Sequence, residues 1–224
     1  MSTHLEIAAV HGWGFDRSCW DGWRQEWKGR ARFSAADRGY FGTPGEAGWG
    51  AEPSGTRILL VHSMGLLFCP PHLLERADVV VLFSCFLRFH PEDGSAARSR
   101  RVVERMRRRL RLRPDSVLTD FWERCGTVRA PAPSQPSVGR LHDDLELLDR
   151  GRAHPDRMRH ARSILVLHGR RDRIVPEASG KRLHAALPER ARFSAVEGAG
   201  HALPFTHMGA CRRLLDHVLA ESTS

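Results

Sequence analysis

The stretch of sequence that decides the fold is an apolar segment that runs into a serine, Arg57-Ile58-Leu59-Leu60-Val61-His62-Ser63-Met64-Gly65. The apolar run predicts a β-strand over Arg57–His62. The chain then turns at Ser63 into a second short apolar segment, Met64–Cys69, and Pro70 and Pro71 interrupt or restart any helix there. A serine between a strand and a helix is a candidate functional residue, although such a serine is also a common helix N-cap.

Five more segments have the length and apolar character of strands: Leu5–Val10, Arg32–Ala36, Asp78–Ser84, Ser163–His168 and Ala191–Val196. Asp78–Ser84 is β-branched and continuously apolar, which is typical of a strand covered on both faces. Helical patterns alternate with the strands, at Trp20–Trp27, Pro176–Leu187 and Met208–Ala220. This alternation predicts the α/β class, with a doubly wound, mostly parallel sheet of about six strands.

The alternation stops between Phe86 and Arg162, where no segment has the pattern of a strand. Helices are expected there over Ser95–Arg113, near Ser116–Cys125 and near Val138–Arg150. The sequence therefore predicts a core formed by residues 1–85 and 163–224, with a helical lid insertion over residues 86–162.

Composition restricts the class of protein further. An apolar fraction of 41% is enough for a core, a mean hydropathy of −0.40 indicates a soluble chain, and no apolar run reaches the roughly 20 residues that span a bilayer. The five cysteines are scattered without a Cys-x-x-Cys pair, and no metal-binding histidine spacing occurs. Because no signal peptide is evident at the N-terminus, we expect a cytoplasmic protein. We also expect a monomer that needs no metal or cofactor and does not bind membranes.

Three polar residues follow three of the predicted strands. Ser63 follows the strand over Arg57–His62, Asp172 lies just past Ser163–His168, and His201 lies just past Ala191–Val196. Parallel sheets place their sites at the carboxyl ends of strands, and Ser, Asp, His is the chain order of one group of serine hydrolases. The pattern predicts Ser63 as nucleophile, Asp172 as acid and His201 as base. Taken singly, each could be a cap, a turn residue or a structural histidine.

A glycine-rich turn, His11-Gly12-Trp13-Gly14, follows the first strand. Attack by a serine on a carbonyl group generates an oxyanion that needs two backbone N–H donors. We expect Met64, directly after the nucleophile, to supply one donor and Trp13 the other, because flanking glycines permit the unusual backbone that aims its N–H inward. The alternative is that these residues form an ordinary tight turn.

The segment Ser95–Arg113 carries nine arginines against one acid, Glu104, and the whole chain has a formal net charge of +9. Its apolar residues fall on one helical stripe, which predicts an amphipathic helix with a cationic outer side. This charge indicates either an anionic partner or only a solvated face in a protein with an arginine bias, which often reflects a GC-rich genome. Nucleic-acid binding is not favoured, because aromatic interleaving and a recognisable binding fold are absent.

Taken together, these motifs resemble the α/β-hydrolase superfamily. His11-Gly12-Trp13-Gly14-Phe15, with Cys19-Trp20 behind it, looks like the start of the carboxylesterases that cleave pimeloyl-acyl-carrier-protein methyl ester in biotin synthesis. The turn Asp37–Gly42 and the loops Gly169–Pro176 and Gly198–Pro204 resemble other superfamily segments. One departure concerns Val61, which stands where the usual Gly-x-Ser-x-Gly turn has its first glycine, so the following helix must be shortened or displaced to make room.

The resemblance implies an esterase that releases methanol and the free pimeloyl carboxylate, with acidic acyl carrier protein as its partner. It implies that His62 lines the substrate pocket, although a packed histidine is an equal alternative. The cationic helix then becomes a docking surface, formed by Arg100, Arg101, Arg105, Arg107, Arg108, Arg109 and Arg111. The alternatives are another acyl hydrolase (a thioesterase or a carbon–carbon bond hydrolase), a non-catalytic binding protein of this fold, and a basic nucleic-acid-binding module.

Overall fold

The protein is built on one parallel sheet of six strands in the order β2-β1-β3-β4-β5-β6, in a computed structural model that describes residues 5–50, 55–127 and 135–221. The strands are β1 (Leu5–Val10), β2 (Ala31–Ala35), β3 (Thr56–His62), β4 (Val79–Phe83), β5 (Ser163–Gly169) and β6 (Ala191–Val196). The six predicted strands are therefore confirmed to within one residue at each end. The expected domain ranges include residues 1–4, 51–54, 128–134 and 222–224, which lie outside the described residues.

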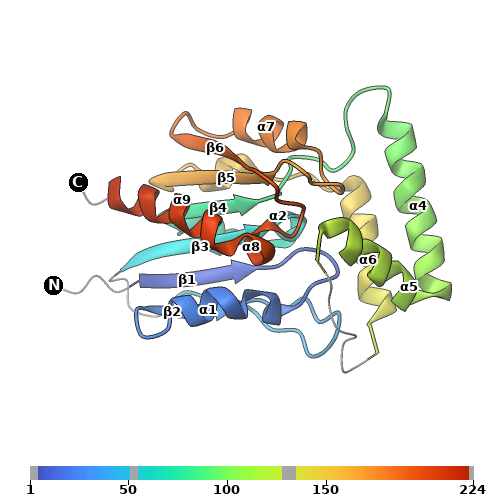
Figure 1. Cartoon of the computed structure of the whole chain (residues 1–224), viewed down its shortest axis with the longest axis horizontal. Coiled ribbons are helices and arrows are strands. Elements are labelled where there is room, and N and C mark those ends of the chain that lie inside the picture. Colours follow the sequence, from blue (N-terminus) through green and yellow to red (C-terminus); the bar gives the residue numbers. More distant parts are fainter. Residues whose placement is uncertain (1–4, 51–54, 128–134, 222–224) are drawn as a thin grey trace.

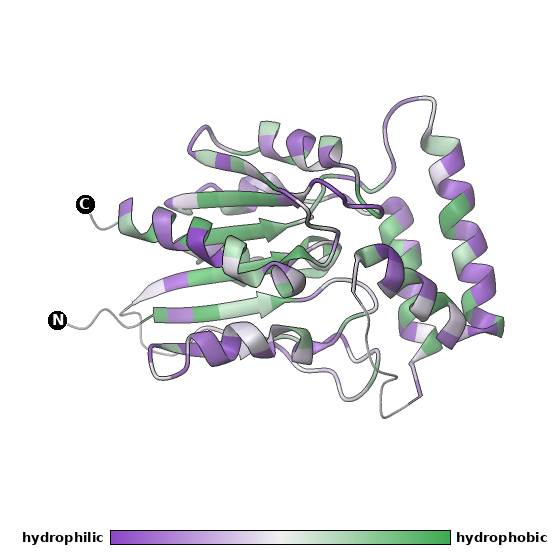
Figure 2. Ribbon diagram, in the orientation of Figure 1, coloured by the Kyte–Doolittle hydropathy of each residue, from purple (hydrophilic) through white to green (hydrophobic). Residues whose placement is uncertain are grey.

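Helices cover both faces of the sheet (Figure 1). One face packs against α1 (Asp21–Glu26) and α9 (Met208–Glu221), and Trp20, Trp23 and Trp27 are all buried in the apolar cluster between them. The opposite face packs against α3 (Pro71–Glu75) and α7 (Glu177–Ala185). Figure 2 shows that the strands are hydrophobic along most of their length, as two-sided burial requires.

The helical insertion between β4 and β5 places its long helices beyond the carboxyl ends of the strands (Figure 1), whereas its last part, around Met158, packs against one face of the sheet. It contains α4 (Ala96–Leu112), α5 (Pro114–Cys125) and α6 (Val138–Arg150), as the sequence predicts. A third apolar cluster joins these helices to the sheet edge, because Val103, Phe121 and Leu145 of the insertion pack in it with Trp13 and Met64 of the core. The turns that carry Trp13 and Met64 therefore pack directly against the helices of the insertion.

The shorter elements complete the chain. They are the 3-10 helices Arg17–Trp20 and Pro155–Met158, and the four-residue helices α2 (Gly65–Phe68) and α8 (Leu203–Thr206). Within the described part of the chain, no helix combines the length and apolar character needed to cross a bilayer.

Candidate active site

The strand order opens a crevice between β1 and β3. The chain leaves β1 towards β2 on one side and leaves β3 towards β4 on the other, so the two connections diverge. The turn after β1 contacts the residue after β3 directly, since a Cβ added to Gly12 would lie 3.0 Å from the Ser63 Cβ. The glycine-rich turn after β1 and the serine turn after β3 thus meet at one point of the sheet edge.

Ser63 occupies a strained turn. Its φ of 55° lies in the left-handed region that residues other than glycine rarely adopt. Its N–H donates to the Phe83 carbonyl at the end of β4 at 2.8 Å, which fixes the turn in place. At the start of α2, a Cβ on Gly65 would lie 2.7 Å from the His11 carbonyl oxygen, so only glycine fits there. This backbone holds the serine side chain away from its own strand.

The departure at Val61 is accommodated by a short helix. Val61 is fully buried and packs in the apolar cluster that contains Leu66 and Leu73. The helix after the serine, α2, ends at Phe68, and Pro70 precedes the start of α3. The expectation that this helix is shortened near the two prolines is confirmed.

Ser63, His201 and Asp172 form one hydrogen-bonded chain. The Ser63 Oγ lies 2.8 Å from His201 Nε2, and His201 Nδ1 lies 2.8 Å from an oxygen of Asp172. The three side chains come from the ends of β3, β6 and β5; Ser63 lies 138 residues before His201 in the sequence, and Asp172 lies 29 residues before it. The side chains of His201 and Asp172 are 1% and 0% exposed, so the chain of hydrogen bonds is shielded from water. The structure thus brings together the three residues predicted from the sequence.

The Asp172 carboxylate is held as an anion by its surroundings. Burial by itself raises the pKa of Asp172, but the charge of His201, its hydrogen bond and the Val175 N–H outweigh this and lower the pKa to about 2. Its other oxygen accepts the Ile174 and Val175 N–H groups, both at 2.8 Å. A carboxylate with this many donors stays charged and fixed in orientation.

Two partners of Asp172 were not identified from the sequence. The Ser84 Oγ donates to the Asp172 oxygen that also faces His201, at 2.8 Å, and Ser84 has a positive φ of 49°. Ser63 and Ser84 are the two residues other than glycine with positive φ in the described ranges. His168 Nε2 lies 3.4 Å from the same Asp172 oxygen, and burial lowers the pKa of His168 so that it remains neutral. The end of β4 therefore contributes to the site as well.

The structure places both residues predicted as oxyanion donors beside the nucleophile. Trp13 and Met64 are both buried and both line the cavity that contains Ser63. Neither of their backbone N–H groups donates to another described residue, so both are available to a ligand. Gly14 has a left-handed backbone, with a φ of 70°, and the Trp13 indole is fixed by donating to the Leu141 carbonyl at 2.8 Å.

The prediction that His62 lines the pocket is wrong. Its side chain is fully buried and does not belong to the described lining of the cavity. It lies behind His201, 3.0 Å from the His201 carbonyl oxygen, with the two rings 5.0 Å apart. Burial and the neighbouring charge of His201 hold the pKa of His62 well below its ordinary value. A neutral His62 therefore donates from Nε2 to that carbonyl and supports the backbone that carries His201.

A cavity of about 290 Å³ opens above Ser63, Met64 and His201. The insertion supplies most of its wall, with Phe86, Phe89, Val103, Met106, Val117, Phe121, Leu145 and Leu148 as apolar lining. A small apolar chamber that ends on the Ser63 hydroxyl suits an acyl chain attached to a reactive carbonyl group. No cluster of His, Cys, Asp and Glu able to hold a metal ion occurs in the described ranges.

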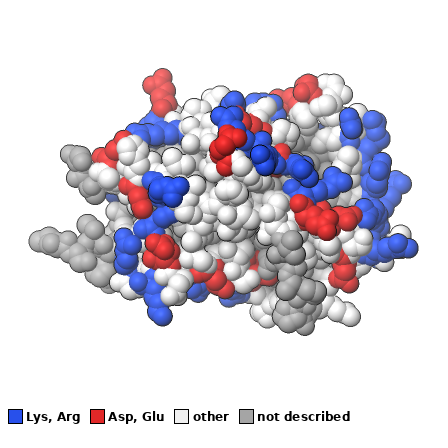
Figure 3. Space-filling view, viewed as in Figure 1, with Lys and Arg blue, Asp and Glu red and all other residues white. Residues whose placement is uncertain are grey.

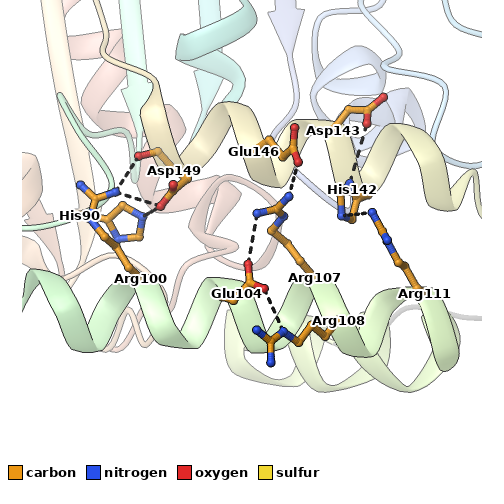
Figure 4. A network of polar contacts seen from close by, with 10 residues as sticks. All are labelled: His90, Arg100, Glu104, Arg107, Arg108, Arg111, His142, Asp143, Glu146 and Asp149. Carbon is orange, nitrogen blue, oxygen red and sulfur yellow. Dashed lines mark hydrogen bonds and ion pairs between the residues drawn. The ribbon is translucent and has the colours of Figure 1, made fainter.

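The predicted docking residues on α4 fall into two groups. Figure 3 shows Lys and Arg side chains gathered at the end of the molecule formed by α4. Three of these arginines face α6 instead of a partner (Figure 4): Arg100 pairs with Asp149 at 3.0 Å, Arg107 pairs with Glu146, and Arg111 donates to His142. This group fastens α4 to α6.

The second group points away from α6. Arg108 pairs with Glu104 on its own helix at 2.9 Å, and Arg109 pairs with Asp120 of α5 at 2.9 Å. Arg101 and Arg105 have no ion-pair partner in the described part of the chain, and Arg105 lines the cavity. The cationic surface available to a partner is therefore smaller than the sequence implied.

Comparison with known proteins identifies the fold. No protein-family model and no curated protein matches the sequence. Among solved structures, an esterase from Exiguobacterium antarcticum is similar over 100% of this chain and 94% of its own, with 15% identity and a TM-score of 0.76. A thermophilic esterase from Thermogutta terrifontis is similar over 99% of this chain and 91% of its own, with 22% identity and a TM-score of 0.66. A bromoperoxidase from Bacillus anthracis is similar over 98% of this chain and 92% of its own, with 17% identity and a TM-score of 0.71. The chain has the α/β-hydrolase fold.

Proposed function

We propose that this protein is a serine hydrolase that cleaves carboxylic esters, with Ser63 as nucleophile, His201 as general base and Asp172 as the supporting acid. One observation carries the proposal: a strained serine lies 2.8 Å from a buried histidine that is itself 2.8 Å from a buried carboxylate, at the end of an apolar cavity. The similarity of the fold to two esterases supports the reaction class.

The geometry accounts for each step of an ester hydrolysis. His201 Nε2 accepts the Ser63 proton as Oγ attacks the ester carbonyl carbon, and the Trp13 and Met64 N–H groups stabilise the oxyanion. The protonated His201 then donates this proton to the departing alcohol, which leaves an acyl group on Ser63. Water, deprotonated by the same histidine, releases the carboxylic acid and restores the serine.

The charged Asp172 serves this cycle by stabilising the transiently protonated His201. Because its pKa of about 2 keeps the carboxylate ionised, it does not take the histidine proton and acts through charge and orientation. Its hydrogen bond to Nδ1 also sets the tautomer of His201 that leaves Nε2 free to accept a proton.

We propose that the substrate is the methyl ester of pimeloyl-acyl-carrier protein and that acidic acyl carrier protein is the partner. The apolar cavity suits a medium-length acyl chain. The α4 arginines that point away from α6, above all Arg101, Arg105 and Arg108, offer positive charge to an acidic partner.

The reaction class is tested with p-nitrophenyl esters. We expect Ser63→Ala to abolish hydrolysis while leaving the unfolding midpoint and circular dichroism spectrum in place, and Ser18→Ala, which changes an exposed serine, to keep full activity. Full activity in Ser63→Ala contradicts the assignment.

The substrate is tested by complementation of a biotin auxotroph that lacks its pimeloyl ester esterase, and by cleavage of the methyl ester on carrier protein. Reversing the charge of Arg101 and Arg108 should lower kcat/KM for the carrier-bound ester but not for a free methyl ester. Equal cleavage of the carrier-bound ester by the wild type and this variant shows that the helix is only a solvated face.

A further inference from the structure

Three arginines from three separate segments converge on the cavity. Arg105 comes from α4, Arg124 from α5, and Arg173 from the loop that follows β5 and carries Asp172. All three line the cavity and are exposed at its opening to solvent. None has an ion-pair partner in residues 5–50, 55–127 or 135–221. Their positive charges are therefore directed at the cavity mouth without an internal counter-charge.

The remaining charges of the cavity lining do not cancel this excess. Four arginines line the cavity against a single described acid, Asp120, and Asp120 is already paired with the fourth arginine, Arg109, at 2.9 Å. The arginines that fasten α4 to α6, by contrast, are each matched to a partner on α6 (Figure 4). Unpaired arginine at the mouth is thus a local feature and does not simply follow from an arginine-rich helix.

The cavity beneath the arginines is apolar. Phe86, Phe121 and Leu145 lie among its walls, and its inner end is formed by Ser63, Met64 and His201. A substrate that places its ester at Ser63 therefore extends an apolar segment along the walls and brings its far end to the three arginines. The planar guanidinium group binds carboxylate and phosphate oxygens through paired hydrogen bonds, and neighbouring apolar walls strengthen such charged contacts.

We propose that the ester substrate carries an anionic group at the end of its acyl chain remote from the ester, and that Arg105, Arg124 and Arg173 bind this group. The proposal rests on the proposed ester hydrolysis at Ser63. The same chemistry has two sources: the free carboxylate of a dicarboxylic acid half-ester, or the phosphate of a pantetheine arm that carries the acyl chain.

The first test compares two esters of equal length. Monomethyl suberate ends in a carboxylate, and the methyl ester of suberic acid monoamide ends in a neutral amide of nearly the same shape. For the second source, methyl suberyl phosphopantetheine is compared with its dephosphorylated form. We expect the charged member of at least one pair to have a kcat/KM about tenfold higher, mainly through KM. The pair that shows the preference identifies the source of the anion.

The residues are tested by the double variant Arg124→Gln/Arg173→Gln. It should remove the preference for the charged ester, so that kcat/KM for this ester falls to about that for the neutral ester, whose far end makes no charged contact. Arg98→Gln is the matched control, since Arg98 is an exposed arginine of α4 that lies outside the cavity lining. Equal kcat/KM for the charged and neutral members of both pairs overturns the proposal.

A binding measurement separates this proposal from the proposed reaction. Calorimetric titration of Ser63→Ala protein with monomethyl suberate and with its amide analogue needs no turnover. Tighter binding of the carboxylate that is lost in the double variant supports the anion site even where no ester is hydrolysed. Hydrolysis of the esters without any charge preference, by contrast, leaves the reaction standing and removes the anion site.

Discussion

The carboxyl edge of the sheet and the helical insertion use polar residues in opposite ways. At the sheet edge, Asp172 is fully buried and its two oxygens accept from His201, Ser84, Ile174 and Val175. In the insertion many charged side chains are partly exposed and paired across the surface, as with Arg100 and Asp149. Buried networks fix geometry, whereas exposed pairs contribute little to stability. Reaction chemistry should therefore depend on the sheet edge, and substrate choice on the insertion.

One charged residue of the insertion, Asp144, is buried and hydrogen-bonded to the core. Asp144 of α6 is 2% exposed and accepts two hydrogen bonds from Arg38, at 2.6 and 2.7 Å, and one from Tyr40 at 2.5 Å. Arg38 and Tyr40 belong to the loop after β2, so this cluster fastens the insertion to the core. The insertion is thus held at α6, while α4 and α5 carry two of the three unpaired arginines of the cavity mouth, Arg105 and Arg124.

The largest effect is expected at the buried network of the sheet edge. Asp172→Asn should lower kcat for p-nitrophenyl esters by about 10,000-fold, because the amide cannot stabilise the protonated His201 and favours the wrong tautomer. Steady-state kinetics measures this, with Asp156→Asn, on a 3-10 helix of the insertion, as the control. A loss of less than tenfold would remove Asp172 from the proposed chemistry.

The next effect concerns the attachment of the insertion. Asp144→Ala should lower the free energy of unfolding by about 3 kcal/mol, because it leaves Arg38 and the buried Tyr40 without their acceptor. Its neighbour Asp143 is exposed, so Asp143→Ala should change stability by no more than about 0.5 kcal/mol. Urea unfolding compares the two variants, and equal midpoints contradict the role given to Asp144.

Acid should weaken the sheet edge in a way that depends on Asp172. Its pKa is lowered from 3.8 to about 2 on folding, so its stabilisation is complete above 3.8 and is lost as pH falls through about 2. The shift corresponds to about 2 kcal/mol. Urea unfolding across this range should show the wild type losing about that much more stability than Asp172→Asn. Parallel pH profiles would contradict the lowered pKa.

A smaller effect is expected from the histidine behind His201. His62→Phe should lower kcat by about tenfold with little change in KM, because His201 loses the donor to its carbonyl group and its placement relaxes. His62→Gln, whose side-chain N–H can donate to the same carbonyl, should recover part of the rate. Equal kcat in the two variants would show that this hydrogen bond does not position His201.

The sheet and the three chemical residues could be predicted because their signals are local. Each strand is an apolar run of sequence, and Ser63, Asp172 and His201 each follow such a run directly. No local sequence pattern indicates the role of Ser84, because its contact with Asp172 depends on the Ser84 φ of 49° and on the approach of the loop after β5. Contacts between distant segments are set by packing, which no single stretch of sequence encodes.

The errors have physical reasons as well. The prediction that His62 lines the pocket rests on its position next to Ser63. The sharp turn at Ser63 directs neighbouring side chains to opposite sides, and His62 faces the rings of Phe15 and Phe205. The docking surface was overestimated because partners such as Glu146 lie about 40 residues away from α4 along the chain. Only the folded insertion reveals which arginines are neutralised.

The most direct measurement of the central claim is covalent labelling with a fluorophosphonate, which reacts with activated serine hydroxyls. The account predicts a single adduct per chain, located by peptide mass spectrometry at Ser63, lost in Ser63→Ala and strongly slowed in Asp172→Asn. An unlabelled protein, or an adduct at another serine that persists in Ser63→Ala, would contradict the account.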